Sequence, residues 1–106
     1  MSKLSRTKGH SFERYVARRL HPIFPDAKRQ LEYQEGLGID LTNTGNLAIQ
    51  CKRYKKYVNP SMIEEVPEGD HIPVLITQAD RKKPIACLYL DDFIKILNDV
   101  MEAYEK

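Results

Sequence analysis

Apolar residues near both ends of the chain recur at helical spacing. The first set is followed by Pro22, which ends a helix. The second set has the i, i+3, i+4, i+7, i+8, i+11 spacing of an amphipathic helix, and Asp91 or Asp92 can cap it. We therefore predict a first helix starting between residues 8 and 11 and a second helix ending the domain. The two sets are Phe12, Tyr15, Val16 and Leu20, and Phe93, Ile96, Leu97, Val100, Met101 and Tyr104.

Shorter apolar runs between the two helices predict strands. Residues 28–35 form a first strand, and residues 38–52 form a hairpin. Residues 73–77 and 85–90 lack alternation, as expected for strands covered on both faces, and a basic turn at 80–83 joins them. Ser61 and Glu64 have the spacing of a capping box, which predicts a short helix before residues 67–69. The order αβββαββα predicts one α/β domain, a mixed β-sheet flanked by helices.

The predicted hairpin carries a polar face whose side chains suit a chemical role. Thr44-Gly45-Asn46 is typical of a three-residue loop with its midpoint at Gly45. In that register Asp40 lies opposite Gln50, with Cβ atoms about 4.5–5.5 Å apart, and Lys52 projects from the same face about 7 Å further along. The other face is apolar: Ile39, Leu41, Leu47, Ile49 and Cys51. A carboxylate, a carbonyl and an ammonium on one face suit a divalent metal held against a phosphodiester.

A simpler interpretation makes these three residues an ordinary solvated sheet face with a cross-strand polar pair. Two features favour a functional site instead. Gly36 and Gly38 precede the acid, and the basic run of residues 52–57 continues directly from Lys52, where nucleic-acid phosphates need neutralising. Glu13, at the edge of the first helix's apolar stripe, is expected to point along the sheet; its alternative is a surface ion pair with helix arginines.

Charge is distributed unevenly, although the net charge of the 106 residues is only +2. Residues 1–56 carry 12 Lys and Arg against 5 Asp and Glu (+7), and residues 57–106 carry 5 against 10 (−5). The basic half contains the proposed site, which favours a polyanion partner over a merely uneven solvated surface. Residues 1–8 are basic without periodicity, so we expect a flexible arm that follows a phosphate backbone.

The remaining composition narrows the class of protein. No run of 18 apolar residues is present, and residues 1–6 lack the apolar segment of a signal peptide, so we expect a cytoplasmic protein. Cys51 and Cys87 lie in apolar runs and are expected to be small buried hydrophobes. The three histidines show no ligand spacing, which argues against zinc.

The motifs together resemble a known family. Lys8-Gly9 and Phe12-Glu13 in the first helix, Gly38-Ile39-Asp40 on the second strand and residues 47–52 on the third resemble the PD-(D/E)XK nuclease superfamily, and within it the Holliday junction resolvases of the archaeal type. The resemblance implies a restriction-endonuclease-like fold, a homodimer, and Mg²⁺-dependent (or Mn²⁺-dependent) cleavage of branched DNA in recombination and repair. The implied catalytic residues are Glu13, Asp40, Gln50 and Lys52; the implied metal ligands are Glu13, Asp40, Gln50 and the Cys51 backbone carbonyl.

Gln50 departs from the pattern because it replaces the usual acid. The resulting QXK form is similar to that of Mrr-like restriction endonucleases, and a glutamine carbonyl is a neutral oxygen ligand that magnesium accepts. Three alternatives remain: a nicking or restriction-like endonuclease, a catalytically inactive DNA-binding module of the same fold, and a small α/β interaction protein. The expected phosphate contacts are Lys3, Arg6, Lys8, Arg53, Lys55, Lys56, Arg81, Lys82 and Lys83.

Overall fold

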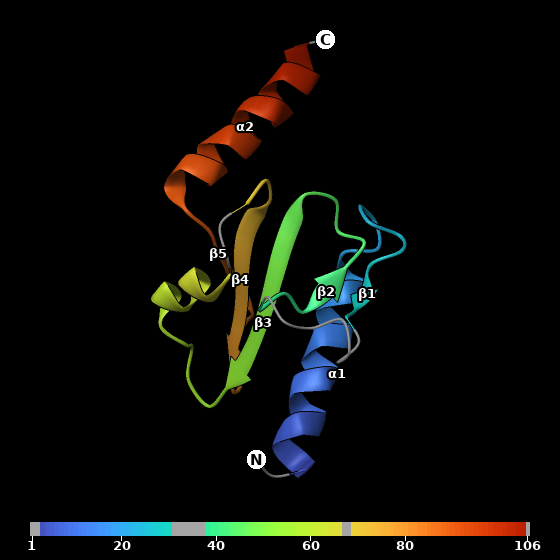
Figure 1. Ribbon diagram of the computed structural model, residues 1–106, viewed down its shortest axis with the longest axis vertical. Helices are drawn as coiled ribbons and strands as arrows, with labels where there is room; N and C mark the ends of the chain where they lie inside the picture. The colour runs from blue at the N-terminus through green and yellow to red at the C-terminus, as the bar shows by residue number, and fades with distance from the viewer. Residues whose placement is uncertain (1–2, 31–37, 67–68, 106) are drawn as a thin grey trace.

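The computed structural model describes residues 3–30, 38–66 and 69–105, and from residue 9 onward it also describes their side chains (Figure 1). These residues form two α-helices, five strands and one 3₁₀-helix. In chain order the elements are α1 (Lys3–Arg19), β1 (Lys28–Arg29), β2 (Leu41–Thr42), β3 (Leu47–Tyr54), η2 (Pro60–Glu65), β4 (Ile72–Ala79), β5 (Ile85–Cys87) and α2 (Leu90–Glu105).

The strands form two sheets, and the larger one is mixed. Strand β3 pairs in parallel with β4 from Leu47 opposite Ile72 to Tyr54 opposite Ala79, and β5 adds to β4 antiparallel. Strands β1 and β2 form a separate antiparallel ladder. The α/β class with a mixed sheet is therefore confirmed. Because parallel neighbours end at the same edge, the carboxyl ends of β3 and β4 lie together (Figure 1).

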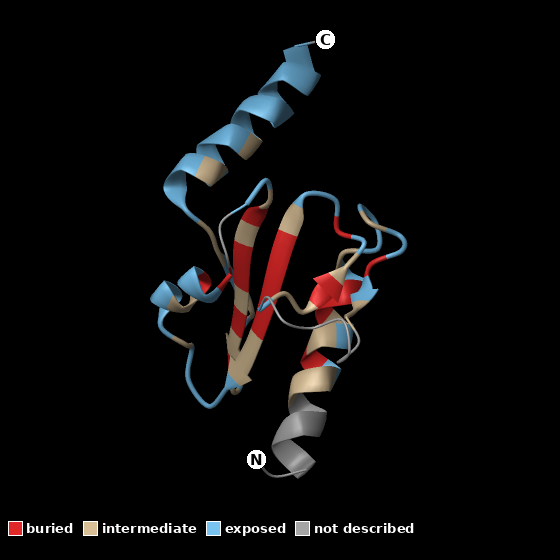
Figure 2. Ribbon diagram, in the orientation of Figure 1, coloured by how far each residue is buried: buried red, intermediate tan, exposed pale blue. Residues whose placement is uncertain are grey.

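Strand β3 is buried from Ala48 to Cys51 because both of its faces are covered (Figure 2). On one face Phe12 and Val16 of α1 join Ile49 and Cys51 in the core cluster. On the other face η2 lies against the sheet through buried Ile63. A strand between two layers is expected to carry apolar side chains on both faces. Gln50 is the exception, since only 1% of it is exposed.

Several element boundaries differ from the sequence predictions. Helix α1 starts at Lys3, so residues 3–8 belong to a helix and not to an arm; no proline interrupts them, and a helix nucleated by its buried stripe propagates readily through such residues. The short 3₁₀-helix η2 is capped by the side chain of Asn59, which accepts from the Ser61 N–H, and not by Ser61. Of the predicted first strand, residues 31–35 lie outside the described part of the chain.

The predicted three-residue hairpin is wrong in its details. Asn43 already adopts a left-handed conformation (φ 63°) and donates its side-chain amide to the Asp26 carbonyl. A turn from Thr44 to Leu47 follows, closed by the Leu47 N–H donating to the Thr44 carbonyl, with Gly45 at φ 62°. The left-handed residue diverts the chain, so the ladder of β2 forms with β1 and not with β3.

Helix α2 forms as predicted but does not pack as predicted. None of its residues is buried, and it extends away from the sheets at one end of the molecule (Figures 1 and 2). Strand β5 is also open, since Ile85 is 42% exposed, so the expectation that this strand is covered on both faces is wrong. Of the predicted stripe, Ile96 packs against the core cluster, and the other large apolar side chains of α2 are exposed: Leu90, Phe93, Ile94, Leu97, Val100, Met101 and Tyr104. No described helix combines the length and the apolar character that a membrane span requires.

The contrast between core and α2 gives a stability prediction. Leu75 is fully buried, so Leu75→Ala should lower the free energy of unfolding by about 2–5 kcal/mol. Leu97 is 45% exposed on α2, and Leu97→Ala should change it by less than about 0.5 kcal/mol in dilute solution. Urea unfolding of both variants measures the difference. Equal costs would mean that α2 packs into the core of the same chain.

Candidate active site and nucleic-acid interface

Asp40 is fixed against the edge of β3 that faces away from β4. Its backbone N–H donates to the Ile49 carbonyl at 2.8 Å, and its side-chain Oδ2 accepts from the Cys51 N–H at 2.7 Å. These two bonds bracket Gln50, so Asp40 lies beside Gln50 without a regular ladder. A carboxylate that replaces a backbone acceptor in this way is held rigidly.

The same bond orients the Cys51 carbonyl. In an extended strand the N–H and C=O of one residue project from the same edge. The Cys51 N–H projects toward Asp40, so the Cys51 carbonyl does as well. Two of the predicted metal ligands, the Asp40 carboxylate and the Cys51 carbonyl, thus belong to one edge of β3.

Gln50 and Lys52 project from one face of β3 and share one partner, Glu65 at the end of η2. Gln50 Nε2 donates to Glu65 Oε2 at 2.6 Å, and Lys52 Nζ lies 3.6 Å from the same oxygen. The Glu65 side chain is 49% exposed and that of Lys52 is 24% exposed. The ion pair is therefore partly solvated, and the bond to Gln50 is partly buried.

This bond determines which way the Gln50 amide points. An ionised carboxylate only accepts hydrogen bonds, so the NH₂ group of Gln50 must face Glu65 and Oε1 occupies the other arm of the amide. Oε1 is buried and finds no hydrogen-bond partner among the described residues. Leaving such an acceptor unsatisfied costs about 1–3 kcal/mol. A buried oxygen held in this state is suited to a ligand.

Glu13 contributes a second carboxylate on the α1 side of β3. Its Oε2 lies 3.7 Å from Arg29 Nε of strand β1, and its side chain is 13% exposed. The sequence predicted that Glu13 points along the sheet, with an ion pair to helix arginines as the alternative; the structure pairs it with Arg29 of strand β1. Burial raises the pKa of the Cys51 thiol well above its usual range, and the charges of Asp40 and Glu13 raise it further. The Cys51 thiol therefore stays protonated at neutral pH.

The donor set suits a hard divalent cation supported by few acids. Among residues 3–30, 38–66 and 69–105, no group of three or more His, Cys, Asp or Glu side chains is placed to hold a metal ion. A metal ion at this site would therefore need amide and backbone oxygens to complete its coordination. Gln50 Oε1 and the Cys51 carbonyl are oxygens of the kind that Mg²⁺ accepts, and Asp40 adds a carboxylate.

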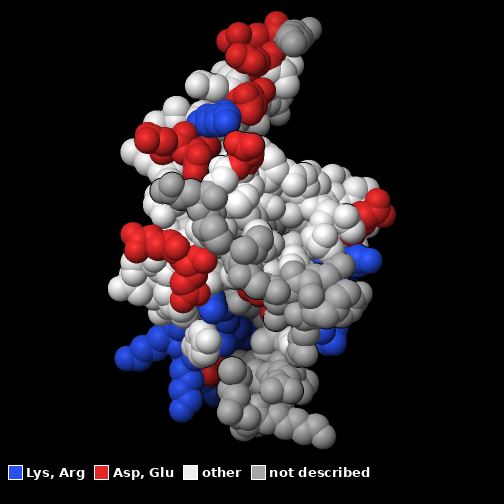
Figure 3. Space-filling model, viewed as in Figure 1, with Lys and Arg blue, Asp and Glu red and all other residues white. Residues whose placement is uncertain are grey.

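Basic side chains gather where β3 and β4 end (Figure 3). The Asp80 N–H donates to the Lys55 carbonyl, and Tyr57 donates its hydroxyl to the Lys83 carbonyl at 2.6 Å. These bonds join the run after β3 to the turn after β4. We call this surface the basic edge; its exposed members are Lys55, Lys56, Arg81, Lys82 and Lys83. Helix α2, with five acidic residues and one lysine, occupies the opposite end of the molecule (Figures 1 and 3).

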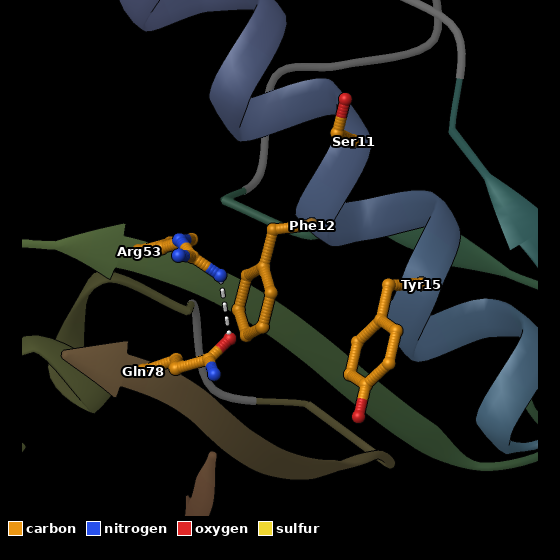
Figure 4. Close-up of a pocket in the computed structure, with 5 residues that line it drawn as sticks. All are labelled: Ser11, Phe12, Tyr15, Arg53 and Gln78. Atoms are coloured by element: carbon orange, nitrogen blue, oxygen red, sulfur yellow. Dashed lines mark hydrogen bonds between the residues drawn. The ribbon is translucent and has the colours of Figure 1, made fainter. Parts of the chain in front are cut away.

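Arg53 belongs to the predicted basic strip but is tied to its neighbours. It donates to Gln78 Oε1 at 2.9 Å and lies 3.8 Å from Asp80 Oδ1. Figure 4 shows the Arg53 and Gln78 pair from the sheet facing Phe12 and Tyr15 from α1. Together with Ser11 these residues line an open hollow of about 490 Å³. The hollow combines a guanidinium with aromatic walls, which suits contact with a phosphate or a base.

The predicted site residues thus fall into three groups, and the members of each group are held by their own contacts. Asp40 joins the Cys51 backbone, Gln50 and Lys52 join Glu65, and Glu13 joins Arg29. Helix α1 begins at Lys3, and its first turns carry the basic residues Lys3, Arg6 and Lys8. Their side chains lie outside the described part of the structure. Sequence reasoning missed Glu65 and Arg29. The pattern around Glu65 offered only a weak signal, an acid between two apolar residues three apart, Ile63 and Val66.

Comparison of the chain with models of protein families, with curated proteins and with solved structures found no match.

The bond from the Cys51 N–H to Asp40 predicts different costs for two substitutions. Asp40→Ala removes the acceptor of a buried N–H and should lower the free energy of unfolding by about 1–3 kcal/mol. Asp40→Asn keeps a side-chain carbonyl that accepts the bond, so it should cost less than about 1 kcal/mol. Urea unfolding at pH 7 measures both, with the exposed Asp70→Ala as control. If Asp40→Ala costs no more than the control, the bond does not support the site.

Proposed function

We propose that the protein is a metal-dependent DNA endonuclease with a restriction-endonuclease-like fold, selective for branched DNA such as a four-way junction. The observation that carries the proposal is the buried Gln50 Oε1, without a hydrogen-bond partner among the described residues, on the residue whose two strand neighbours bond to Asp40 through their backbone. Asp40 bonds to the edge of β3 at Cys51, and Lys52 shares the partner Glu65 with Gln50.

In this proposal the chain's own groups have separate tasks. Asp40, Gln50 Oε1 and the Cys51 carbonyl hold Mg²⁺ (or Mn²⁺), and Glu13 adds negative charge from α1. When bound, the ion polarises the phosphodiester and lowers the pKa of a coordinated water. The Lys52 ammonium lies at the exposed side of the site, where it stabilises negative charge that develops on the scissile phosphate.

The basic edge supplies the DNA interface. It lies at the end of β3, only about 10 Å of strand beyond Lys52, so one phosphate backbone reaches both surfaces. Contacts from lysines to phosphates carry no sequence information, which suits an enzyme that selects DNA by shape. An inactive DNA-binding module would use the same edge, and the cleavage assay below separates the two.

A homodimer is part of the proposal. The exposed apolar stripe of α2 alternates by three and four residues from Leu90 through Ile94 and Leu97 to Met101 and Tyr104, the spacing of a helix-pairing seam. A second copy of α2 covers this stripe and gives two active sites for two strands. In that case the cost of Leu97→Ala rises with protein concentration.

Cleavage tests the proposal directly. The wild-type protein should cut a labelled four-way junction in the presence of Mg²⁺ and not with EDTA. Asp40→Asn should lower the rate at least 100-fold while leaving junction affinity within about threefold, because it removes a charge that holds the ion but keeps the backbone bond. Duplex, flap and single-stranded DNA serve as comparison substrates. Metal-independent cutting, or full activity of Asp40→Asn, would contradict the metal assignment; binding without cutting would indicate the inactive module.

Salt dependence tests the basic edge. Lys55→Ala and Lys82→Ala should each weaken junction binding and reduce the slope of log affinity against log salt by about 1, because each lysine neutralises one phosphate. Lys95→Ala on α2 provides the matched control and should leave the slope unchanged. Fluorescence anisotropy at several NaCl concentrations measures the slopes. Equal slopes in all three variants would place DNA on another surface.

A further inference from the structure

Glu65 of η2 stands where it can act on both polar residues of the QXK motif. Its Oε2 accepts from Gln50 Nε2 at 2.6 Å and lies 3.6 Å from Lys52 Nζ. The site lacks an acid at position 50, and this carboxylate is the hydrogen-bond partner of the glutamine that stands there. The contact reaches from the 3₁₀-helix to the central strand, across 15 positions of sequence.

From these contacts we infer that Glu65 is a positioning residue of the proposed metal site: it holds the Gln50 amide so that Oε1 faces the cation, and it holds the Lys52 ammonium beside it. This inference rests on the proposed function. A free glutamine amide can present either its oxygen or its NH₂ group, and only the oxygen binds a cation. A carboxylate on one side removes that choice, because it accepts from NH₂ and repels the oxygen.

The backbone fixes Glu65 in this place independently of the side-chain bonds. Ile63 and Val66 are both buried, and they anchor the last turn of η2. Gly38, two residues before Asp40, meets the same turn: a Cβ added at Gly38 would lie 3.1 Å from the Glu65 carbonyl oxygen. The segment that carries Asp40 and the turn that carries Glu65 therefore touch.

Groups that orient metal ligands through hydrogen bonds typically change metal affinity or activity by about 10–100-fold when they are removed. Glu65→Gln abolishes the exclusive acceptor, since the new amide can donate to Gln50 as well as accept from it. We expect it to weaken Mg²⁺ binding about tenfold, as measured by isothermal titration calorimetry. Glu64→Gln is the matched control, because it makes the same charge change on the preceding, exposed residue of η2 and should stay within twofold of wild type.

The pair also predicts a rescue. Gln50→Glu alone sets two carboxylates within hydrogen-bond distance of each other, so it should bind Mg²⁺ no more tightly than wild type, although it restores the usual acid. Combining it with Glu65→Gln reverses the polarity of the bond and leaves a carboxylate for the ion. The double variant should recover at least wild-type affinity, a non-additivity expected of groups in direct contact.

The outcomes separate this inference from the function on which it rests. Additive effects of the two substitutions, or equal affinities of Glu65→Gln and Glu64→Gln, would overturn the positioning role; if the wild type still cuts junctions in an Asp40-dependent manner, the proposed function stands. A wild type that neither binds Mg²⁺ nor cuts DNA overturns both. Urea unfolding verifies that each variant is folded, and if Gln50→Glu does not fold, the comparison of Glu65→Gln with Glu64→Gln decides.

Discussion

The burial of β3 on both faces is the constraint on which the rest of the structure depends. Helix α1 covers one face through Phe12 and Val16, and on the other face η2 lies against β4 and reaches β3 through the bond from Gln50 to Glu65. A polar residue in this strand loses water on folding, so each polar atom needs a partner within the protein or a ligand. Gln50 satisfies its NH₂ group through Glu65 and leaves Oε1 without a partner among the described residues. Because Gln50 is buried, its Oε1, unpartnered among the described residues, is an atom that a ligand would satisfy.

Parallel pairing of β3 with β4 explains why the candidate site around Gln50 and Lys52 lies next to the basic edge. It requires a crossover, and η2 lies in that crossover, which brings Glu65 over Gln50 and Lys52. It also makes the two strands end at one edge, where Lys55 meets the turn after Asp80. One topological feature therefore places an acid over the site and cations beside it. Neither arrangement requires residues that are close in sequence.

How much of this was readable from the sequence depends on the range of the interaction. The helical periods predicted both α-helices, and the apolar run predicted the buried strand β4, because these patterns reflect local geometry. The packing of α2 was not predictable, since periodicity shows that a face is apolar but not what covers it. The hairpin prediction was wrong at one residue, Asn43, which has a left-handed backbone. Its side chain bonds to the Asp26 carbonyl, 17 positions away in the sequence.

In the candidate site, too, the sequence predicted the local geometry and missed the contacts between distant residues. The placement of Gln50 and Lys52 on one face follows from the period of a strand, and their shared contact with Glu65 agrees with it. The position of Asp40 next to Gln50 was expected from a ladder, yet it arises from a backbone bond and a side-chain bond that bracket Gln50. Glu65 and Arg29 reach the site from other elements, so no spacing in the sequence indicated them.

Gly38 shows how the two halves of the candidate site are linked. The sequence marked it only as a glycine before the acid, whereas in the structure it has φ 67° and lies against the backbone of Glu65. Any larger residue meets two obstacles there: a left-handed backbone disfavoured for L-residues, and a carbonyl oxygen only 3.1 Å from its Cβ. A backbone oxygen does not move aside as a flexible side chain does. The segment that carries Asp40 and the turn that carries Glu65 therefore depend on the same glycine, so their geometry varies together.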